Sequence, residues 1–264
     1  MFNFSSLYSG SSGNCLFVET DNTKILIDAG VSQRKISDAL ASFNVDFSQI
    51  DAILVTHEHT DHTKNLGAIS QKYNIPIYIN EKTLNSIPSQ KDKISEDNKN
   101  IFVSNKAFTL NDLDIYPFSI PHDAADPCGF NIYYKGKKLT IATDIGHIEN
   151  KMLTNFKDSD FILLEANYDP DILKYSRYPY QLKQRILSPV GHLSNSTAGK
   201  TLAEIVTKSS NTKRAMLGHL SKENNFPELA LKTVQDELSA ENITKKDVSI
   251  QVASRDFPSK LIKI

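Results

Sequence analysis

A cluster of histidine and aspartate side chains follows the apolar run at residues 52–56, AILVT. Residues 56–62 have the sequence THEHTDH, so three of the seven histidines fall within six residues. In an extended chain, side chains two residues apart point to the same side, so His57 and His59 can bind one metal ion together. Asp61 and His62 follow at the turn into the next predicted helix and can face a second ion. Imidazole and carboxylate groups suit zinc, manganese or iron, and no thiolate is required.

A second chemical feature is a basic run between residues 172 and 203, which contains no Asp or Glu. It carries five basic residues and three tyrosines in a chain whose net charge is −1. Positive charge with aromatic side chains suits a polyanion with stackable bases, and the alternative is an ordinary solvated face. Because the run leads directly into His192, we favour a substrate path. The residues are Lys174, Tyr175, Arg177, Tyr178, Tyr180, Lys183, Arg185 and Lys200.

The tetrapeptide Gly-His-Leu-Ser occurs twice, at residues 191–194 and 218–221. Two copies do not make a solenoid, which needs at least three repeats. We therefore expect two turns that each bring a histidine, His192 and His219, to a functional site.

Short β-rich runs alternate with helical runs along the chain, and we find no linker or low-complexity segment. One domain over residues 1–264 is therefore expected, and two packed sheets with helices outside are compatible with the pattern. Residues 89–100 are polar and should form a loop. We expect strands at residues 15–18 and 24–28 (a hairpin), 52–56, 77–79, 101–103, 113–120, 129–134, 139–143, 161–164, 215–217 and 248–253, and helices at 32–43, 63–73, 196–207 and 227–238.

The composition is that of an ordinary soluble globular enzyme, with 39% hydrophobic and 23% charged residues among 264. The net charge implies no global attraction to nucleic acid or to a membrane. Two cysteines, Cys15 and Cys128, exclude a disulfide scaffold and a cysteine-rich zinc ribbon, and they fit a reducing compartment. We find neither an apolar run of membrane-spanning length nor the features of a signal peptide. A cytoplasmic location without a membrane partner is expected.

The motif at residues 57–62 resembles that of the metallo-β-lactamase superfamily, and the resemblance extends over nearly the whole chain. It implies an α/β fold, an αββα sandwich of two mixed β-sheets flanked by helices, with two divalent metal ions (Zn, Mn or Fe). It further implies that His122 completes the first metal site, that Asp144 bridges both ions and that His219 completes the second site. Asp28 matches a strand-end aspartate that orients the metal loop.

The residues at these positions also separate branches of the superfamily. Asp144 stands where many true β-lactamases have cysteine, and His59 stands where flavodiiron oxidoreductases have glutamate, so both branches are disfavoured. Thioester and phosphodiester hydrolases remain. His192 resembles the extra histidine of phosphodiesterases such as the tRNA 3′-processing nucleases, which protonates the leaving oxygen, and Glu165 resembles the acidic residue that holds it. The structural alternatives are a helix-capping turn at 192 and a plain strand-end glutamate at 165.

A narrower resemblance is to the YycJ/WalJ family of bacterial metallo-hydrolases, which implies 5′-to-3′ exonuclease action on double-stranded DNA. Two departures are visible. Lys64 and Asn65 stand where many superfamily members have glycine, and asparagine tolerates a left-handed backbone. The chain also lacks the large insertion of the β-CASP nucleases. The segments that match lie at residues 9–15, 57–62, 121–124, 177–180, 182–188, 191–195 and 217–225.

The expected function is therefore a two-metal phosphodiesterase that acts on nucleic acid, with DNA as the favoured substrate. Asp61 or Asp144 would take the proton of the attacking water, and His192 would protonate the leaving oxygen. A hydrolase of cyclic or short diesters, a thioester hydrolase and a non-catalytic nucleic-acid-binding module are the alternatives. No role is assigned to His147, and the native metal, the cleavage polarity and the oligomeric state stay open. The candidate substrate-binding residues are Arg177, Tyr178, Lys183, Arg185 and Ser194.

Overall fold

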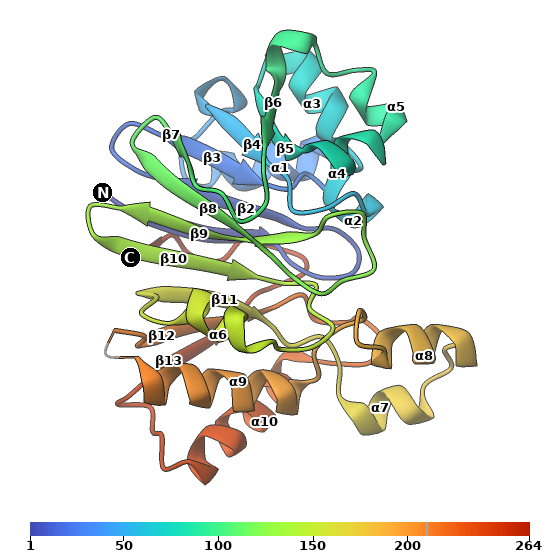
Figure 1. The fold of residues 1–264 in the computed structure, drawn as a ribbon, viewed down its shortest axis with the longest axis vertical. Coiled ribbons are helices and arrows are strands. Elements are labelled where there is room, and N and C mark those ends of the chain that lie inside the picture. The colour runs from blue at the N-terminus through green and yellow to red at the C-terminus, as the bar shows by residue number, and fades with distance from the viewer. Residues whose placement is uncertain (210) are drawn as a thin grey trace.

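The computed structural model of the chain describes residues 1–209 and 211–264. Two seven-stranded β-sheets pack face to face, and helices cover their outer faces (Figure 1). This arrangement confirms the expected αββα sandwich. The first sheet has the order β14-β1-β2-β3-β4-β5-β6, with β1 (Asn3–Tyr8), β2 (Cys15–Glu19), β3 (Lys24–Ile27), β4 (Ala52–Leu54), β5 (Ile77–Asn80), β6 (Lys99–Phe102) and β14 (Ile262–Lys263).

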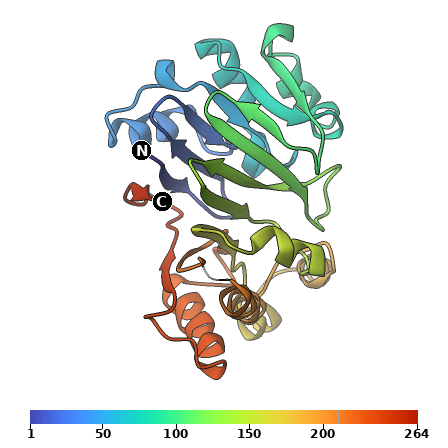
Figure 2. The same cartoon turned by 60° about the vertical axis from the view of Figure 1, so that its left-hand side comes forward.

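The second sheet repeats the pattern of the first. In each sheet, three antiparallel strand pairs are followed by three parallel pairs, so both sheets are mixed. The chain ends lie close together in both views, because β14 pairs with β1 (Figures 1 and 2). The order is β13-β12-β11-β10-β9-β8-β7, with β7 (Phe108–Leu110), β8 (Leu113–Ser119), β9 (Cys128–Tyr134), β10 (Lys137–Ala142), β11 (Phe161–Glu165), β12 (Arg214–Gly218) and β13 (Ser249–Val252).

The apolar core lies in three layers. The middle layer packs the two sheets together through side chains such as Phe4, Ile27 and Phe130, and each outer layer packs a sheet against its helices. None of the described helices is long and apolar enough to cross a membrane. The helices are α1 (Gln33–Ala41), α2 (Thr60–Thr63), α3 (Leu66–Tyr73), α4 (Glu81–Asn85), α5 (Pro88–Lys91), α6 (Asn150–Phe156), α7 (Pro170–Tyr175), α8 (Tyr180–Leu187), α9 (Asn195–Lys208) and α10 (Pro227–Ala240), with 3₁₀ turns at Phe47–Gln49 and Glu96–Asn98.

Helix α9 shows how local sequence produces these elements. Its N-cap residue is Ser194, whose Oγ accepts a hydrogen bond from the backbone N–H of Thr197 at 3.1 Å. Its buried face includes Ala198, Leu202 and Ile205, which follow the i, i+4, i+7 spacing of one helix face. The cap sets where α9 begins, directly after the segment that carries His192.

Two expectations were wrong in detail. Residues 89–100 are not a loop throughout, because they include the end of α5, a 3₁₀ turn and the start of β6, which pairs in parallel with β5. The helix expected at 63–73 is divided into α2 and α3. Asn65, whose residue type tolerates a left-handed backbone, has φ −114° and does not adopt one, and its Nδ2 donates to the carbonyl of Val31 at 2.8 Å. The assignment of one domain stays a prediction.

The carboxyl ends of six strands converge on one edge of the sandwich. In the first sheet, β3 and β4 are parallel neighbours, and in the second sheet β10, β11 and β12 are parallel neighbours. Strand β8 also ends on this edge, because it is antiparallel to β9, which is antiparallel to β10. The loops after these strands carry the histidines and carboxylates singled out in the sequence.

Candidate metal centre and active site

Sharp backbone bends direct several candidate side chains into the site. Asp28, Asp144 and His219 follow strands β3, β10 and β12 and have φ values of 63°, 62° and 55°. Left-handed backbone is costly for residues other than glycine and persists where the surroundings hold it in place. Here the N–H of Asp28 donates to the carbonyl of Leu54 at 2.9 Å, and the N–H of His219 donates to Ser9 Oγ at 2.8 Å. These contacts stabilise the bends that turn Asp28 and His219 toward the centre.

His57, His59 and His122 form the first cluster, with ligating atoms all within 4.8 Å of one another. His59 Nδ1 lies 3.3 Å from His122 Nε2. His57 is fully buried, and its Nε2 has no hydrogen-bond partner. The structure thus brings together His57 and His59, which the spacing predicted for one metal ion, and His122, which the family resemblance added to them.

Asp61, His62 and His219 form the second cluster. Asp61 Oδ2 lies 3.5 Å from His62 Nε2 and 3.6 Å from His219 Nε2. The Nε2 atom of His219 is buried and has no hydrogen-bond partner. This set corresponds to the predicted second site.

Asp144 lies between the two clusters. Its Oδ2 is 3.4 Å from His62 Nε2, and its Oδ1 is 3.8 Å from His122 Nε2 and 3.4 Å from His219 Nδ1. The carboxylate is buried, and Oδ2 has no hydrogen-bond partner. One carboxylate is therefore within reach of ligands from both clusters.

The donor atoms fit a divalent metal ion. Buried polar atoms in proteins are nearly always paired, yet His57 Nε2, His219 Nε2 and Asp144 Oδ2 are not. Burial, with the neighbouring histidines His62, His122 and His59, holds the pKa of His57 well below its usual range, so its imidazole is neutral, as a metal ligand must be. Imidazole nitrogens and carboxylate oxygens together suit Zn, Mn or Fe.

Negative charge accumulates around the second cluster. Although burial opposes it, the carboxylates of Asp144, Asp61 and Glu165 raise the pKa of His219 to about 10. The same kind of balance raises the pKa of His62, where burial is outweighed by Asp144, Asp61 and Asp28. Without a cation, these carboxylates retain protons on the histidines. A divalent ion can take the place of those protons.

Asp28 lies behind the metal loop and orients it. Its Oδ1 accepts from the backbone N–H of Thr56 at 2.9 Å, and its Oδ2 accepts from Thr56 Oγ1 at 2.8 Å. Oδ2 also lies 2.7 Å from His62 Nδ1. A bond at Nδ1 fixes the ring so that Nε2 faces Asp61 and Asp144, which is the placement that the sequence resemblance implied for Asp28.

Glu165 connects the two Gly-His-Leu-Ser turns. Its Oε1 accepts from His192 Nδ1 at 2.8 Å and from His219 Nδ1 at 2.9 Å. Its Oε2 accepts from the backbone N–H groups of Ile145 at 2.7 Å and Leu193 at 3.2 Å. The expected Glu165–His192 contact is present, and the contact with His219 was not anticipated. His192 Nδ1 also lies 3.9 Å from Asp144 Oδ1, which places this histidine beside the clusters.

Several of the predicted substrate-binding side chains have partners within the protein, and their role in binding substrate stays a prediction. Arg185 forms a two-point ion pair with Asp123, through Nε and through Nη2 at 3.1 Å. Lys183 Nζ donates to the carbonyls of Lys174 and Ser176 at 2.8 and 2.7 Å, which holds α7 to α8.

Among the other predicted substrate-binding residues, some also contact the protein itself and one is exposed. Tyr178 packs against a small apolar cluster, Ser194 caps α9, and Arg177 is exposed. His147, for which the sequence indicated no role, is half exposed and its Nδ1 donates to the carbonyl of Pro189 at 2.7 Å.

Two asparagines at the site were missed by reasoning from the sequence. Asn14 Nδ2 lies 3.0 Å from His62 Nε2 and 3.3 Å from Asp61 Oδ2, and Asn167 Nδ2 donates to the carbonyl of His219 at 2.8 Å. The available signals were weak. Asn14 ends the Gly-Ser-Ser-Gly turn between β1 and β2, and Asn167 follows the end of β11 by two residues.

Gly30 allows the metal loop to approach the segment after β3. A Cβ at this position would lie 1.6 Å from the carbonyl oxygen of Asp61 and 2.8 Å from the backbone nitrogen of His62. Any side chain would therefore displace the loop backbone that carries Asp61 and His62.

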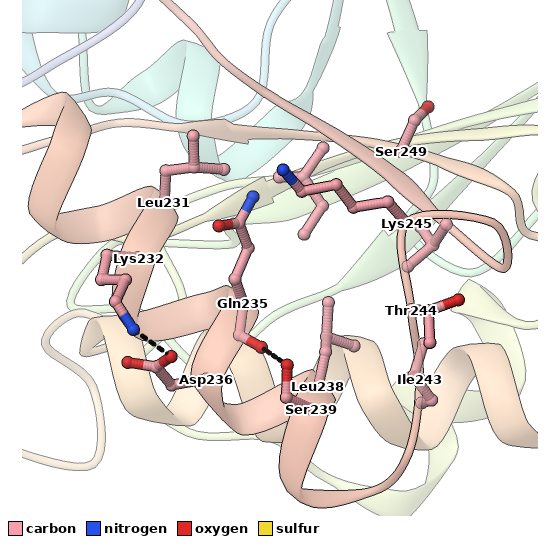
Figure 3. A pocket seen from close by; sticks show the side chains of 12 residues that line it. Leu231, Lys232, Gln235, Asp236, Leu238, Ser239, Ile243, Thr244, Lys245 and Ser249 are labelled. Carbon is pink, nitrogen blue, oxygen red and sulfur yellow. Dashed lines mark hydrogen bonds and ion pairs between the residues drawn. The ribbon is translucent and has the colours of Figure 1, made fainter.

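A separate cavity of about 490 Å³ lies between α10 and the segment that leads into β13. Figure 3 shows Gln235, Lys245 and the ion-paired Lys232 and Asp236 among its lining. None of the candidate site residues lines it.

Comparisons with known proteins show which family and which fold this chain resembles. A family model described as a β-lactamase superfamily domain matches residues 23–220. The exodeoxyribonuclease WalJ of Streptococcus pneumoniae is 39% identical over 266 aligned residues, which cover 100% of this chain and 98% of that protein. The exodeoxyribonuclease YycJ of Bacillus anthracis is 39% identical over 235 residues, covering 89% of this chain and 88% of that protein.

A solved structure extends the likeness to the fold. The metallo-β-lactamase fold protein YhfI from Bacillus subtilis superimposes with a TM-score of 0.73 at 16% identity, covering 98% of this chain and 99% of that one.

Proposed function

Because the chain belongs to the β-lactamase superfamily and, within it, to the family of the WalJ and YycJ exodeoxyribonucleases, we propose that it is a metal-dependent exonuclease. It would remove nucleotides from the 5′ ends of double-stranded DNA. It is a hydrolase of phosphodiester bonds. The proposal for DNA comes from relatives that match along the whole chain and are named for action on deoxyribonucleic acid. A cytoplasmic location remains a prediction.

The observation that carries the proposal is His192, which belongs to neither of the two clusters described above. It lies beside them in a further group with Asp144, Glu165 and His219, whose ligating atoms are all within 4.8 Å of one another. His192 is fixed through Nδ1 by the buried carboxylate of Glu165, and this leaves Nε2 as the atom that can give up a proton. A phosphodiester leaving group is an alkoxide, which must be protonated as the P–O bond breaks, so a general acid is useful here. Hydrolysis of a thioester gives a weakly basic thiolate and has less use for such a group.

The ligand set divides into two groups joined by Asp144. His57, His59 and His122 would hold one ion, and Asp61, His62 and His219 would hold the other, with Asp144 shared. Two divalent ions would supply Lewis acidity toward the phosphoryl oxygens and a water of lowered pKa.

The chain's own groups would handle the protons. Asp61, which is partly exposed, or Asp144 accepts the proton of the attacking water, and His192 donates one to the leaving oxygen. Glu165 holds the His192 ring in place during the transfer.

The test is a cleavage assay with protein loaded in turn with Zn²⁺, Mn²⁺ or Fe²⁺. Substrates are duplex DNA labelled at either the 5′ or the 3′ end, single-stranded DNA, RNA and bis(p-nitrophenyl) phosphate. We expect stepwise release of nucleotides from the 5′ end of duplex DNA. Hydrolysis of the small diester alone, or internal cuts without release from an end, would overturn the proposal.

A matched pair of histidines tests the proton donor. His192→Ala should keep its metal and lower kcat on DNA by ~10²–10⁴, the usual range for general acid–base catalysis. His147→Ala removes a nearby half-exposed histidine that touches a backbone carbonyl and serves as the control. A smaller defect on a diester with a nitrophenolate leaving group would identify His192 as the proton donor, and equal defects on both substrates would exclude it.

A further inference from the structure

Helices α7 and α8 form a hairpin that projects beside the catalytic edge. Figure 1 shows the two helices standing out from the side of the molecule toward which β10 runs. The hairpin has an apolar cluster of its own, made by Tyr168, Leu173 and Ile186, with Tyr178 packed against it. The hairpin is therefore a folded element whose outer surface is available for binding, although the sequence predicted no helix there.

Two tyrosines of this hairpin point away from its cluster. Tyr175 at the end of α7 is 78% exposed, and Tyr180 at the start of α8 is 75% exposed. Leu187, seven residues after Tyr180 and so on the same face of α8, is 52% exposed. Exposed aromatic and apolar side chains grouped on a small projection are typical of a binding surface.

The charge around these rings favours a polyanion. No Asp or Glu occurs from Ile172 to Ala203. Lys174 Nζ lies 5.2 Å from the centroid of the Tyr175 ring, and Arg177 is exposed in the connection between the helices. A cation beside an aromatic ring suits a nucleotide, because the base can stack on the ring while the cation neutralises the phosphate. Asp171, in the first turn of α7, is the one acidic side chain within the two helices.

The hairpin is joined directly to the catalytic centre. Arg185 of α8 pairs with Asp123, the backbone N–H of Asp123 donates to the carbonyl of Val190 at 3.1 Å, and His122 Nδ1 lies 3.1 Å from the carbonyl oxygen of Gly191. Five residues of helix separate Tyr180 from Arg185, a rise of ~7.5 Å. That is about two steps along one DNA strand at ~3.4 Å per step.

From these contacts, and resting on the proposed nuclease function, we propose that Tyr175 and Tyr180 stack on unpaired nucleobases of the DNA strand that enters the catalytic centre. Bases inside a duplex are stacked on one another and offer no free face to a ring. The hairpin therefore binds a strand that has separated from its complement, and the enzyme prefers duplexes with an unpaired end over duplexes paired to the last base.

The test compares two oligomers with equal phosphates and different bases. One probe is a fluorescent oligo-dT, and the other is an abasic oligomer of the same length. Binding is read as the initial anisotropy change on rapid mixing with metal-loaded protein. The variants are Tyr175→Ala/Tyr180→Ala and Tyr175→Phe/Tyr180→Phe. The control is Tyr133→Ala, which removes a partly exposed tyrosine from the far end of β9.

We expect the double alanine variant to weaken binding of oligo-dT by about 5- to 160-fold per ring, while binding of the abasic oligomer changes far less. The double phenylalanine variant should restore binding, because the ring and not the hydroxyl stacks. Unchanged thermal melting of all variants would show that the hairpin is folded.

Other outcomes would overturn the proposal. Equal losses with both oligomers, no loss with either, or a loss that phenylalanine does not restore would each show that the rings do not stack on bases. The proposed function fails separately. Wild-type protein that prefers oligo-dT over the abasic oligomer but releases no nucleotide from any DNA would refute the nuclease and leave the stacking surface in place.

Discussion

Replacing Glu165 by glutamine should damage both metal binding and turnover. The fully buried carboxylate accepts four hydrogen bonds, two from histidine Nδ1 atoms and two from backbone N–H groups. Although burial opposes ionisation, His192 and His219 hold the pKa of Glu165 below its usual range, so the site is built for the charged form. Glutamine has one acceptor oxygen and one amide nitrogen that donates. Whichever way the amide turns, its nitrogen faces two donors.

The magnitude follows from that count. Two of the four bonds are lost, and a hydrogen bond to a charged group contributes about 1.5–3 kcal/mol. The free energy of unfolding should therefore fall by about 3–6 kcal/mol. If the amide nitrogen faces the histidines, His219 loses the partner that orients it, and metal affinity should fall by ~10–100-fold. The loss of His192 orientation should lower kcat in addition.

The assay combines metal content after dialysis, thermal melting with and without chelator, and kcat on DNA. His192→Ala is the first comparison, because it removes the proton donor and leaves the Glu165–His219 contact. Glu58→Gln is the matched control, because Glu58 Oε1 accepts from the backbone N–H of Ala125 and glutamine can keep that bond. If Glu165→Gln kept full metal content and wild-type melting, and lost only turnover, the inference that Glu165 supports His219 would be refuted.

Three further outcomes are expected. In chelator, the raised pKa of His219 stabilises the folded protein fully below the ordinary histidine pKa of 6.5, and this stabilisation is lost as the pH rises toward about 10. The denaturant midpoint of unfolding should therefore fall between those pH values, and His219→Gln should make the fall smaller. A midpoint that rises with pH would contradict this. Gly30→Ala should push against the backbone of Asp61 and lower both metal content and melting temperature, and a crystal structure with the loop unmoved would contradict this. Because Arg185 is already paired with Asp123, Arg185→Gln should affect DNA binding through the position of the α7–α8 hairpin: it should raise KM for DNA, and adding Asp123→Asn should cost little more. Fully additive losses would show that the two side chains act independently.

Several features of this protein could be predicted without a structure because they are local in the chain. The spacing of His57, His59, Asp61 and His62 after a buried strand is a short-range pattern, and ligand type follows from residue type. The strands next to the site are apolar runs of the right length, and most of them were placed within a few residues. The family resemblance added His122, Asp144 and His219 in chain order, and the structure brings those residues together.

The remaining features depend on contacts between residues far apart in the sequence. Glu165 reaches His219 as well as His192, because parallel pairing sets the end of β11 beside the end of β12. Arg185 contacts Asp123 because α8 packs against the loop after β8. A side chain that the sequence predicted to bind substrate is therefore already in an ion pair.

The tyrosines of the basic run show the same division. Tyr178 packs inward while Tyr175 and Tyr180 face solvent, and composition treats the three alike. Charge and residue type belong to the sequence, whereas burial and hydrogen-bond or ion-pair partners arise only when distant segments pack together. The sequence therefore determined which chemical groups are present, and the tertiary structure decided which of them are free to act.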